Sequence, residues 1–346
     1  MKALVYQGPG KPPVLEERPI PEIHADGDAI VKIGKTTICG TDLHILKGDL
    51  PICTPGRILG HEGVGVVSKT GTGVSAFRVG EQVVISCISA CAKCEYCRRG
   101  MYSHCTTGGW ILGNVIDGTQ AEYVRIPHAD TSLYAAPAGS DEEALVMLSD
   151  ILPTGFECGV LKGCVEPGKT LAIVGAGPIG LAALLTAQFY SPSEIIVIDL
   201  DDNRLATAKR LGATATVNGS DGKATEAVLK LTAGRGVDTA IEAVGVPASF
   251  QTCQEIVAPG GYIANIGVHG VKVELHLERL WSQNVTITTR LVDTVTLPML
   301  LKTVESRKID PTLLITHRFP LEKIVEAYEV FGHAASTQAL KVIIST

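Results

Sequence analysis

Residues 170–199 read TLAIVGAGPIGLAALLTAQFYSPSEIIVID, and this stretch decides the fold of the chain. An apolar strand at 170–174 leads into three closely spaced glycines, then into a helical pattern at 178–190 and a second apolar strand that ends at Asp199. The same alternation of strands and helices continues to about residue 293. It predicts right-handed βαβ units and a doubly wound parallel sheet of the α/β class.

The glycines form the pattern G-x-G-x-x-G directly between a strand and a helix. Glycines permit the tight turn and let backbone N–H groups approach a pyrophosphate, while the helix N-terminus adds the positive end of its dipole. A glycine-rich turn that binds no nucleotide is the alternative. The cofactor-binding residues predicted in this turn are Gly175, Gly177, Pro178, Ile179 and Gly180.

The second strand ends in a carboxylate, Asp199, at the position where a dinucleotide fold accepts hydrogen bonds from the adenosine ribose. A carboxylate there repels the 2′-phosphate of NADP, which favours NAD. Arg204 is a further candidate for cofactor binding, because an arginine near the ribose is able to pair with that phosphate. Asp199, backed by Asp201 and Asp202, outweighs it, so the sequence predicts NAD.

The first 150 residues have a different sequence pattern. Short apolar strands such as KALVY, DAIVKI and GVGVVSK alternate with Gly, Pro and Asp, which is typical of a compact β-rich domain. After residue 293 the strand and helix alternation stops, and a helix around 322–331 precedes a last strand, ALKVIIS. We expect this tail to pack back on the β-rich domain.

Composition excludes several classes of protein. The net charge is −6 with no basic stripe, so nucleic acid is not an expected partner. The most apolar helical run, 179–187, is shorter than the roughly 20 residues that a membrane span needs. The chain has ten cysteines, and its N-terminus, MKALVYQGPGKPP, does not resemble a signal peptide, which predicts a cytoplasmic protein.

Four cysteines lie within fifteen residues, in the pattern C-x2-C-x2-C-x7-C. This spacing suits a tetrahedral zinc with every position filled by protein, a closed site that builds structure. Disulfides, an iron–sulfur cluster and unpaired thiols are the alternatives. The predicted ligands are Cys91, Cys94, Cys97 and Cys105.

A second metal site is suggested by Cys39 in ICGTDLH and by His61 in GHEGVG. A catalytic zinc takes three protein ligands and keeps one position for water or substrate. Taken alone, these two residues more often are a buried thiol and a core histidine. Their presence beside a nucleotide-binding motif and a four-cysteine loop favours the metal.

These motifs together resemble the zinc-dependent medium-chain alcohol dehydrogenases over essentially the whole chain. The run GHEGVGVVSKTGTGV, Gly60–Val74, looks like the zinc signature of that family. The resemblance implies two zinc ions per chain, NAD, and a homotetramer, since the segment between Cys105 and Gly118 is short. It also implies three parts: a GroES-like catalytic domain with both zinc sites at 1–152, a Rossmann NAD-binding domain at 153–293, and a C-terminal return at 294–346.

The third ligand in the family comes from just before the nucleotide-binding domain, where this chain reads LSDILPTGF. Asp150 occupies that position, which is similar to bacterial secondary-alcohol dehydrogenases. Cys158 and Cys164 lie nearby as competing candidates. Glu62 is an alternative or transient ligand by the same resemblance.

The resemblance also assigns residues that handle the proton and the substrate. Thr41 and His44 match the family's hydroxyl and histidine relay, and Asp42 matches the carboxylate that orients the ligand histidine. Trp110 is a candidate wall of the substrate pocket, although a lone tryptophan is as often part of a core.

The sequence therefore predicts reversible hydride transfer between an alcohol, expected to be secondary, and NAD. A polyol or L-threonine dehydrogenase of the same family is the alternative, because CGTDLHI looks like threonine dehydrogenases. A zinc-free quinone reductase shares the fold but lacks these ligands. A non-catalytic nucleotide sensor has no reason to keep Cys39, Thr41, His44 and His61 together.

Overall fold

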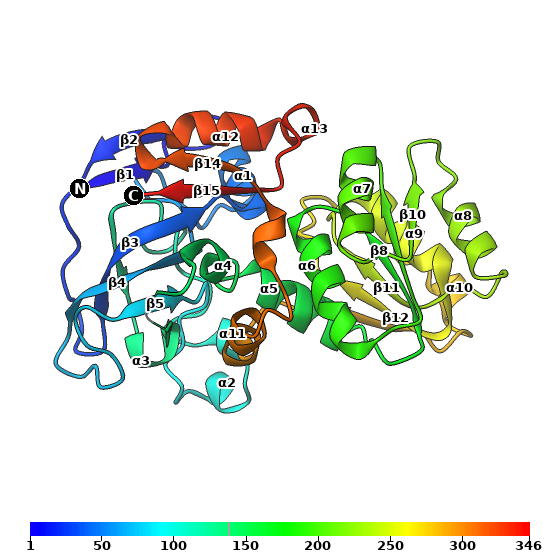
Figure 1. The fold of residues 1–346 in the computed structure, drawn as a ribbon, viewed down its shortest axis with the longest axis horizontal. Helices are drawn as coiled ribbons and strands as arrows, with labels where there is room; N and C mark the ends of the chain where they lie inside the picture. The colour runs from blue at the N-terminus through cyan, green and yellow to red at the C-terminus, as the bar shows by residue number, and fades with distance from the viewer. Residues whose placement is uncertain (138) are drawn as a thin grey trace. The chain divides into compact units, whose positions relative to one another are not determined.

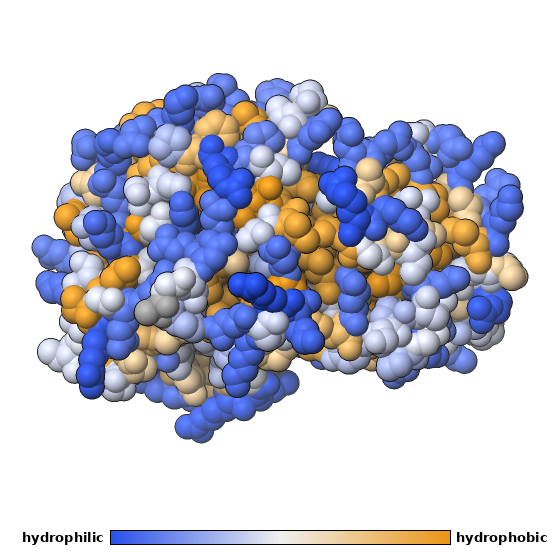
Figure 2. Space-filling model, in the orientation of Figure 1, coloured by the Kyte–Doolittle hydropathy of each residue, from blue (hydrophilic) through white to orange (hydrophobic). Residues whose placement is uncertain are grey.

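The computed structural model describes residues 1–137 and 139–346, which divide into two units. The first unit consists of Met1–Pro153 and Asp293–Thr346, and the second unit consists of Thr154–Val292. Among the described residues, no helix combines the length and apolar character that crossing a membrane requires. Figure 2 shows hydrophilic side chains over much of the visible face, with apolar groups between them.

The second unit is built on a parallel sheet of six strands in the order β10-β9-β8-β11-β12-β13, of which β8, β10, β11 and β12 are labelled in Figure 1. The chain starts in the middle of the sheet, adds strands toward one edge, then returns and adds strands toward the other edge. This order and the parallel registers confirm the predicted doubly wound α/β sheet. The strands are β8 (Thr170–Val174), β9 (Glu194–Asp199), β10 (Ala215–Asn218), β11 (Val237–Glu242), β12 (Val257–Asn265) and β13 (Thr286–Thr289).

The helices of the second unit connect these strands. The strand β8 is buried along its whole length, as expected for a central strand covered on both faces. The helix α6 is also buried almost throughout. The helices are α6 (Pro178–Ala187), α7 (Asp202–Arg210), α8 (Ala224–Leu231), α9 (Pro247–Ile256) and α10 (Leu277–Leu280), with a π-helix, η2 (Gly155–Leu161), and a 3-10 turn, η3 (Gln188–Tyr190).

The first unit contains a largely antiparallel sheet in the order β14-β15-β3-β4-β5-β7, with β6 also paired to β3, and a separate pair β1-β2. The strand β15, which follows the second unit in the sequence, belongs to this sheet because it pairs with β3. The strands are β1 (Lys2–Val5), β2 (Val14–Glu17), β3 (Ala29–Thr37), β4 (Gly63–Thr70), β5 (Gln82–Ile85), β6 (Tyr123–Ile126), β7 (Leu133–Ala135), β14 (Ile315–Pro320) and β15 (Lys341–Ser345).

Most helices of the first unit are short. The helix α12 is amphipathic and buries Ile324, Ala327, Tyr328 and Phe331, which lie on one face at helical spacing. The helices are α1 (Gly40–Lys47), α2 (Glu95–Arg98), α3 (Ala129–Ser132), α4 (Glu142–Val146), α11 (Leu297–Glu305), α12 (Ile324–Gly332) and α13 (Ala334–Thr337), with 3-10 turns η1 (Tyr102–His104), η4 (Pro311–Leu314) and η5 (Leu321–Lys323). The helix α5 (Ile151–Thr154) carries the chain from the first unit into the second.

The glycine-rich turn between β8 and α6 depends on close backbone packing. Gly175 has φ of +109°, in the left-handed region that favours glycine. A Cβ atom added to Gly180 would lie 1.9 Å from the carbonyl oxygen of Gly175. A Cβ atom added to Gly177 would meet no atom within 4 Å in this structure. Gly175 is therefore favoured by its positive φ and Gly180 by close backbone packing, whereas packing in this structure does not require glycine at position 177.

We expect Gly180→Ala to destabilise the second unit, because the added methyl group overlaps a backbone oxygen. Overpacking of this kind costs about 1–3 kcal/mol, which corresponds to a loss of about 5 °C in Tm. Gly177→Ala is the matched control and should change Tm by at most about 2 °C. Differential scanning calorimetry measures both variants. Equal Tm values for the two would show that the overlap is relieved by small backbone shifts.

Candidate active site and metal centres

Three side chains of the first unit, Cys39, His61 and Asp150, converge on one point. Cys39 follows β3 and starts α1, and His61 lies two residues before β4. The antiparallel pairing of β3 and β4 places Thr36 opposite Gly63, so the end of one strand and the beginning of the next bring Cys39 and His61 together. Asp150 arrives directly before α5. One ligand atom from each of the three lies within 4.8 Å of the other two.

The geometry of this cluster fits a zinc ion. His61 Nε2 lies 3.4 Å from Asp150 Oδ2, and Cys39 Sγ lies 3.9 Å from the same oxygen. Ligand atoms around a tetrahedral zinc stand roughly 3.3–3.8 Å apart, given zinc–ligand bonds of about 2.0–2.3 Å. Thiolate, imidazole and carboxylate are all zinc ligands. Three protein ligands leave one coordination position for water or substrate.

The electrostatics of the cluster also favour a cation. Burial opposes a charge on His61, yet Asp150 and Cys39 outweigh this effect and raise the pKa of the imidazole well above its ordinary value. Two acidic groups buried together are costly unless a positive charge accompanies them. A divalent metal supplies that charge and leaves the imidazole neutral.

Asp42 supports the ligand histidine from behind. Its Oδ1 lies 3.8 Å from His61 Nδ1, and neither atom has a hydrogen-bond partner. Its Oδ2 accepts hydrogen bonds from the Cys39 amide at 2.9 Å and from Gln120 Nε2 at 3.1 Å. Tyr328 in turn donates to Gln120 Oε1 at 2.8 Å. Sequence reasoning missed Gln120 and Tyr328, because both are far from the motif along the chain.

Glu62 lies outside the three-residue cluster, although it is the next residue after His61. Its Oε2 accepts a hydrogen bond from Lys341 Nζ at 2.5 Å and another from the hydroxyl of Thr37. Glu62 and Lys341 are each 1% exposed, so this is a fully buried ion pair. The role of Glu62 as an alternative metal ligand stays a prediction. The sequence did not identify Lys341 as the partner of Glu62.

The predicted relay residues both lie on α1. Thr41 Oγ1 is 3.6 Å from Cys39 Sγ, which places the hydroxyl at the edge of the cluster. His44 lies one turn further along the helix, and its side chain is 27% exposed. The left-handed Gly48 ends the helix and turns the chain so that Asp49 Oδ2 lies 2.7 Å from His44 Nδ1.

Trp110 lies against the metal cluster. Its ring meets that of His61 edge-on, with the two ring centroids 5.9 Å apart. The structure thus places this tryptophan beside the cluster, while its contact with a substrate stays a prediction.

The four cysteines of the loop form a second cluster, in the first unit. Their sulfur atoms all lie within 4.8 Å of one another, and Cys91 Sγ is 4.0 Å from Cys97 Sγ, about twice the length of a disulfide bond. Backbone N–H groups of Cys94 and Cys97 point at sulfur atoms of the loop. Hydrogen bonds from the Cys97 and Thr106 amides lower the pKa of Cys94 to about 6. Four thiols arranged in this way, including Cys105, fit a closed tetrahedral zinc.

The predicted dinucleotide residues meet at the carboxyl ends of β8 and β9. Asp199 Oδ2 accepts a hydrogen bond from the Ala176 amide at 2.6 Å, so the carboxylate touches the glycine-rich turn. Its Oδ1 accepts from the amides of Leu200 and Asp201. Three backbone donors fix this carboxylate at the position that the motif requires.

The N-terminus of α6 lies directly after the glycine-rich turn, at the carboxyl end of β8. Gly177 is the N-cap, and Pro178 and Ile179 are the first residues of the helix. Arg204 lies in the first turn of α7, where Asp201 caps the helix. The structure therefore brings the glycine-rich turn, a helix N-terminus and Asp199 together in the second unit.

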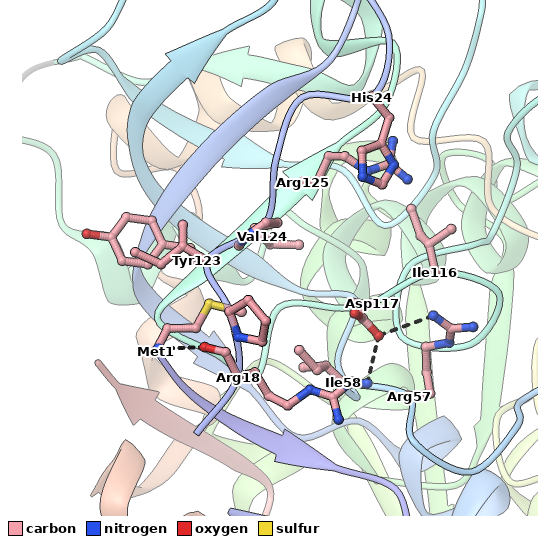
Figure 3. A pocket seen from close by; sticks show the side chains of 13 residues that line it. Met1, Arg18, His24, Arg57, Ile58, Ile116, Asp117, Tyr123, Val124 and Arg125 are labelled. Atoms are coloured by element: carbon pink, nitrogen blue, oxygen red, sulfur yellow. Dashed lines mark hydrogen bonds and ion pairs between the residues drawn. The ribbon is translucent and has the colours of Figure 1, made fainter. Parts of the chain in front are cut away.

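A cavity of about 370 Å³ lies elsewhere in the first unit and is lined by none of the predicted site residues (Figure 3). Three arginines line it, and each is already engaged. Arg57 pairs with Asp117 at 3.2 Å, Arg125 pairs with Asp28 at 2.9 Å, and Arg18 pairs with Glu16 at 3.8 Å. These pairings leave the cavity without an excess of positive charge for an anion.

Comparisons with known proteins agree with this geometry. Residues 25–137 match the alcohol dehydrogenase GroES-like domain, and residues 178–306 match the zinc-binding dehydrogenase domain. An alcohol dehydrogenase from Cupriavidus necator is 36% identical over an alignment of 361 positions, which covers 96% of this chain and 95% of that protein. An L-threonine 3-dehydrogenase from Bacillus subtilis is 34% identical, and the alignment covers 99% of this chain and 98% of that protein.

Among solved structures, the zinc dependent alcohol dehydrogenase 2 from Streptococcus pneumonia, in its apo form, is 57% identical. The alignment covers 100% of this chain and 98% of that one, with a TM-score of 0.96. The matches confirm that the chain contains the predicted GroES-like domain and the predicted parallel-sheet domain. The chain belongs to the zinc-dependent medium-chain alcohol dehydrogenases.

Proposed function

We propose that this enzyme transfers a hydride reversibly between an alcohol, expected to be secondary, and NAD. The observation that carries the proposal is the cluster of Cys39, His61 and Asp150, a set of three donors with room for a fourth ligand. Zinc held by these residues would supply Lewis acidity toward the alcohol oxygen and lower the pKa of the hydroxyl, and NAD would accept the hydride.

The chain's own residues serve the proton that the alcohol gives up. The Thr41 hydroxyl at the edge of the cluster is placed to accept it, and His44, one turn along α1, is exposed enough to pass it to water. Asp49 faces Nδ1 of His44 and leaves Nε2 as the nitrogen that receives the proton. Asp42 holds His61 in one orientation by facing its Nδ1.

NAD is supported by the surroundings of Asp199. Three backbone amides hold the carboxylate at the end of β9, where a ribose with free hydroxyl groups gains hydrogen bonds and a 2′-phosphate meets a negative charge. Arg204, in the next helix, is the residue that would favour NADP.

A second candidate function is oxidation of L-threonine or of a polyol. The similarity to an L-threonine 3-dehydrogenase over nearly the whole chain supports it, as does the run CGTDLHI. A panel of simple secondary alcohols, sorbitol and L-threonine, followed by NADH absorbance, decides between the two. Faster turnover of threonine or sorbitol than of every simple alcohol would assign the second function.

The homotetramer and the cytoplasmic location belong to the same proposal. The short segment between Cys105 and Gly118 supports the tetramer. The chain has ten cysteines, and none of them forms a disulfide among the described residues, which supports a reducing compartment. Size-exclusion chromatography with light scattering measures the mass of the assembly directly, and a dimer would contradict the proposed state.

We expect Cys39→Ala to lower the zinc content from two ions per chain to one and to reduce kcat/KM roughly a thousandfold, because a thiolate ligand is lost. Cys53→Ala is a matched control, since Cys53 is also buried but lies outside both clusters. Plasma emission spectrometry measures the zinc. A Cys39→Ala enzyme with two zinc ions and full activity would overturn the catalytic assignment.

We expect Cys94→Ser to remove the other zinc ion and to lower Tm by about 10 °C or more, since a closed site contributes folding free energy. Turnover at low temperature should fall much less than in Cys39→Ala. The exposed Cys164 provides the control variant Cys164→Ser, which should keep both metals and the wild-type Tm. Loss of turnover with an unchanged Tm would argue against a structural role.

We expect Asp199→Ala to raise the KM for NAD by about tenfold or more, because the ribose loses a charged acceptor. The preference of the enzyme for NAD over NADP should decrease as well. Asp238→Ala is the control, because the Asp238 carboxylate pairs with Lys169 and accepts a hydrogen bond from the amide of Thr170, at the end of β8 opposite the glycine-rich turn. Initial rates with both cofactors test this. An unchanged NAD to NADP ratio in Asp199→Ala would contradict the assignment.

A further inference from the structure

A buried carboxylate stands at the carboxyl end of β11 without a role in the proposed mechanism. Glu242 is fully buried. Its Oε1 accepts hydrogen bonds from the amides of Val244 at 2.9 Å and Gly245 at 2.8 Å, and from the hydroxyl of Ser249. This oxygen thereby fixes the loop that follows β11.

The other oxygen of Glu242 faces a histidine from a second loop. His269 Nε2 lies 3.3 Å from Glu242 Oε2 and 2.8 Å from Asn265 Oδ1. Asn265 Nδ2 donates to the carbonyl oxygen of Gly267 at 3.0 Å, and the Gly267 amide donates to the main-chain carbonyl of Glu242. The side chain of Glu242 thus connects the loop after β11 to the loop after β12.

The two loops also pack backbone against backbone. Gly245 has φ of +87°, and a Cβ atom added there would lie 2.2 Å from the carbonyl oxygen of Val268. A Cβ atom added to Gly267 would lie 2.3 Å from the Gly245 nitrogen and 2.4 Å from Glu242 Oε2. Small relative shifts of the two loops therefore change the contact between Glu242 and His269 directly.

These loops lie at the same edge of the sheet as the glycine-rich turn. The register places Val174 of β8 opposite Glu242, and Glu242 opposite Asn265 of β12. Figure 1 shows β8 and β11 side by side in the sheet of the second unit. A Cβ atom added to Gly175 would lie 2.6 Å from Val244, so the β11 loop touches the glycine-rich turn.

A doubly wound sheet binds one mononucleotide on each side of its centre. The strands β8, β9 and β10 carry the turn and Asp199 for the adenosine half, so the carboxyl ends of β11 and β12 face the other half. Val244 and Val268, one on each of the two loops, are each 48% exposed. They offer an apolar surface suited to one face of an aromatic ring.

We propose that Glu242 and His269 are positioning residues that hold the loops after β11 and β12 in the arrangement that receives the nicotinamide half of the cofactor. This inference rests on the proposed use of NAD. A carboxylate buried without solvent is costly. The chain compensates Oε1 of Glu242 with two amides and a hydroxyl, while His269 from the other loop faces Oε2, which accepts no hydrogen bond from the described residues. The pair acts through the loops and does not itself touch the reacting atoms.

The test compares two ligands that share the adenosine half. NADH contains the nicotinamide half and ADP does not. Isothermal titration calorimetry measures the affinity of the full-length zinc-loaded protein for each of these two ligands. In His269→Ala, we expect the Kd for NADH to rise about tenfold or more, because the buried Glu242 carboxylate loses the group that faces it from the loop after β12. The Kd for ADP should stay within about twofold.

Two further variants make the comparison specific. His269→Gln restores an amide donor toward Glu242 and should recover most of the NADH affinity. His276→Ala is the control, because His276 belongs to the same unit but pairs with Glu274 and Glu278. If His269→Ala does not fold, Asn265→Ala removes a contact of the same imidazole and should show the same split between NADH and ADP.

The outcomes are distinct. Equal weakening of NADH and ADP, or unchanged NADH affinity in a folded variant, overturns the positioning role and leaves the proposed function intact. Wild-type protein that binds neither ligand overturns the proposed function itself. A selective loss for NADH with rescue by glutamine establishes the pair as part of the nicotinamide site.

Discussion

The pairing of β3 with β4 is the constraint on which the first unit depends. It sets Thr36 opposite Gly63 and thereby brings together two predicted ligands, Cys39 and His61, which are 22 positions apart in the sequence. The same strand β3 also pairs with β6 and with β15. A shift of one residue in this register would turn the side chains of a strand to the opposite face. The metal cluster therefore inherits its geometry from backbone hydrogen bonds, which side-chain changes at the surface do not alter.

Buried charge is the second theme, and each unit handles it in a comparable way. In the first unit, Lys341 compensates Glu62 and a Gln120 amide supports Asp42. In the second unit, backbone amides and His269 surround Glu242. Such groups are expensive to bury, and removing one partner leaves the other uncompensated. They cost stability relative to an apolar core, but they hold neighbouring loops in one arrangement, which a binding site needs.

Local patterns allowed the sequence to predict the dinucleotide turn with Asp199 and the four-cysteine loop, since each lies within about thirty positions. The parallel sheet was predicted from the repeated alternation of strands and helices along the chain. Asp150 was reached only through resemblance, because no spacing rule links it to Cys39. Gln120, Tyr328 and Lys341 were missed, since their proximity to the cluster arises from packing of distant segments. The helix α1 and the strands β2 and β7 were also missed. The strands β2 and β7 have only four and three residues, so their patterns are too short to stand out. The helix α1 has eight residues but buries only Asp42 and Ile45, so it has no clear apolar periodicity.

The discontinuity of the first unit has a consequence for biosynthesis. The second unit is one continuous segment, Thr154–Val292, whereas the sheet of the first unit is completed only by β14 and β15. On a ribosome, Thr154–Val292 emerges entire while β3 still has an open edge where β15 will pair. During that interval Glu62 is without the ammonium group of Lys341, which follows the whole second unit in the sequence. Closure of the sheet edge and neutralisation of this carboxylate are therefore a single late event, and the nascent chain is most exposed to misassembly just before it.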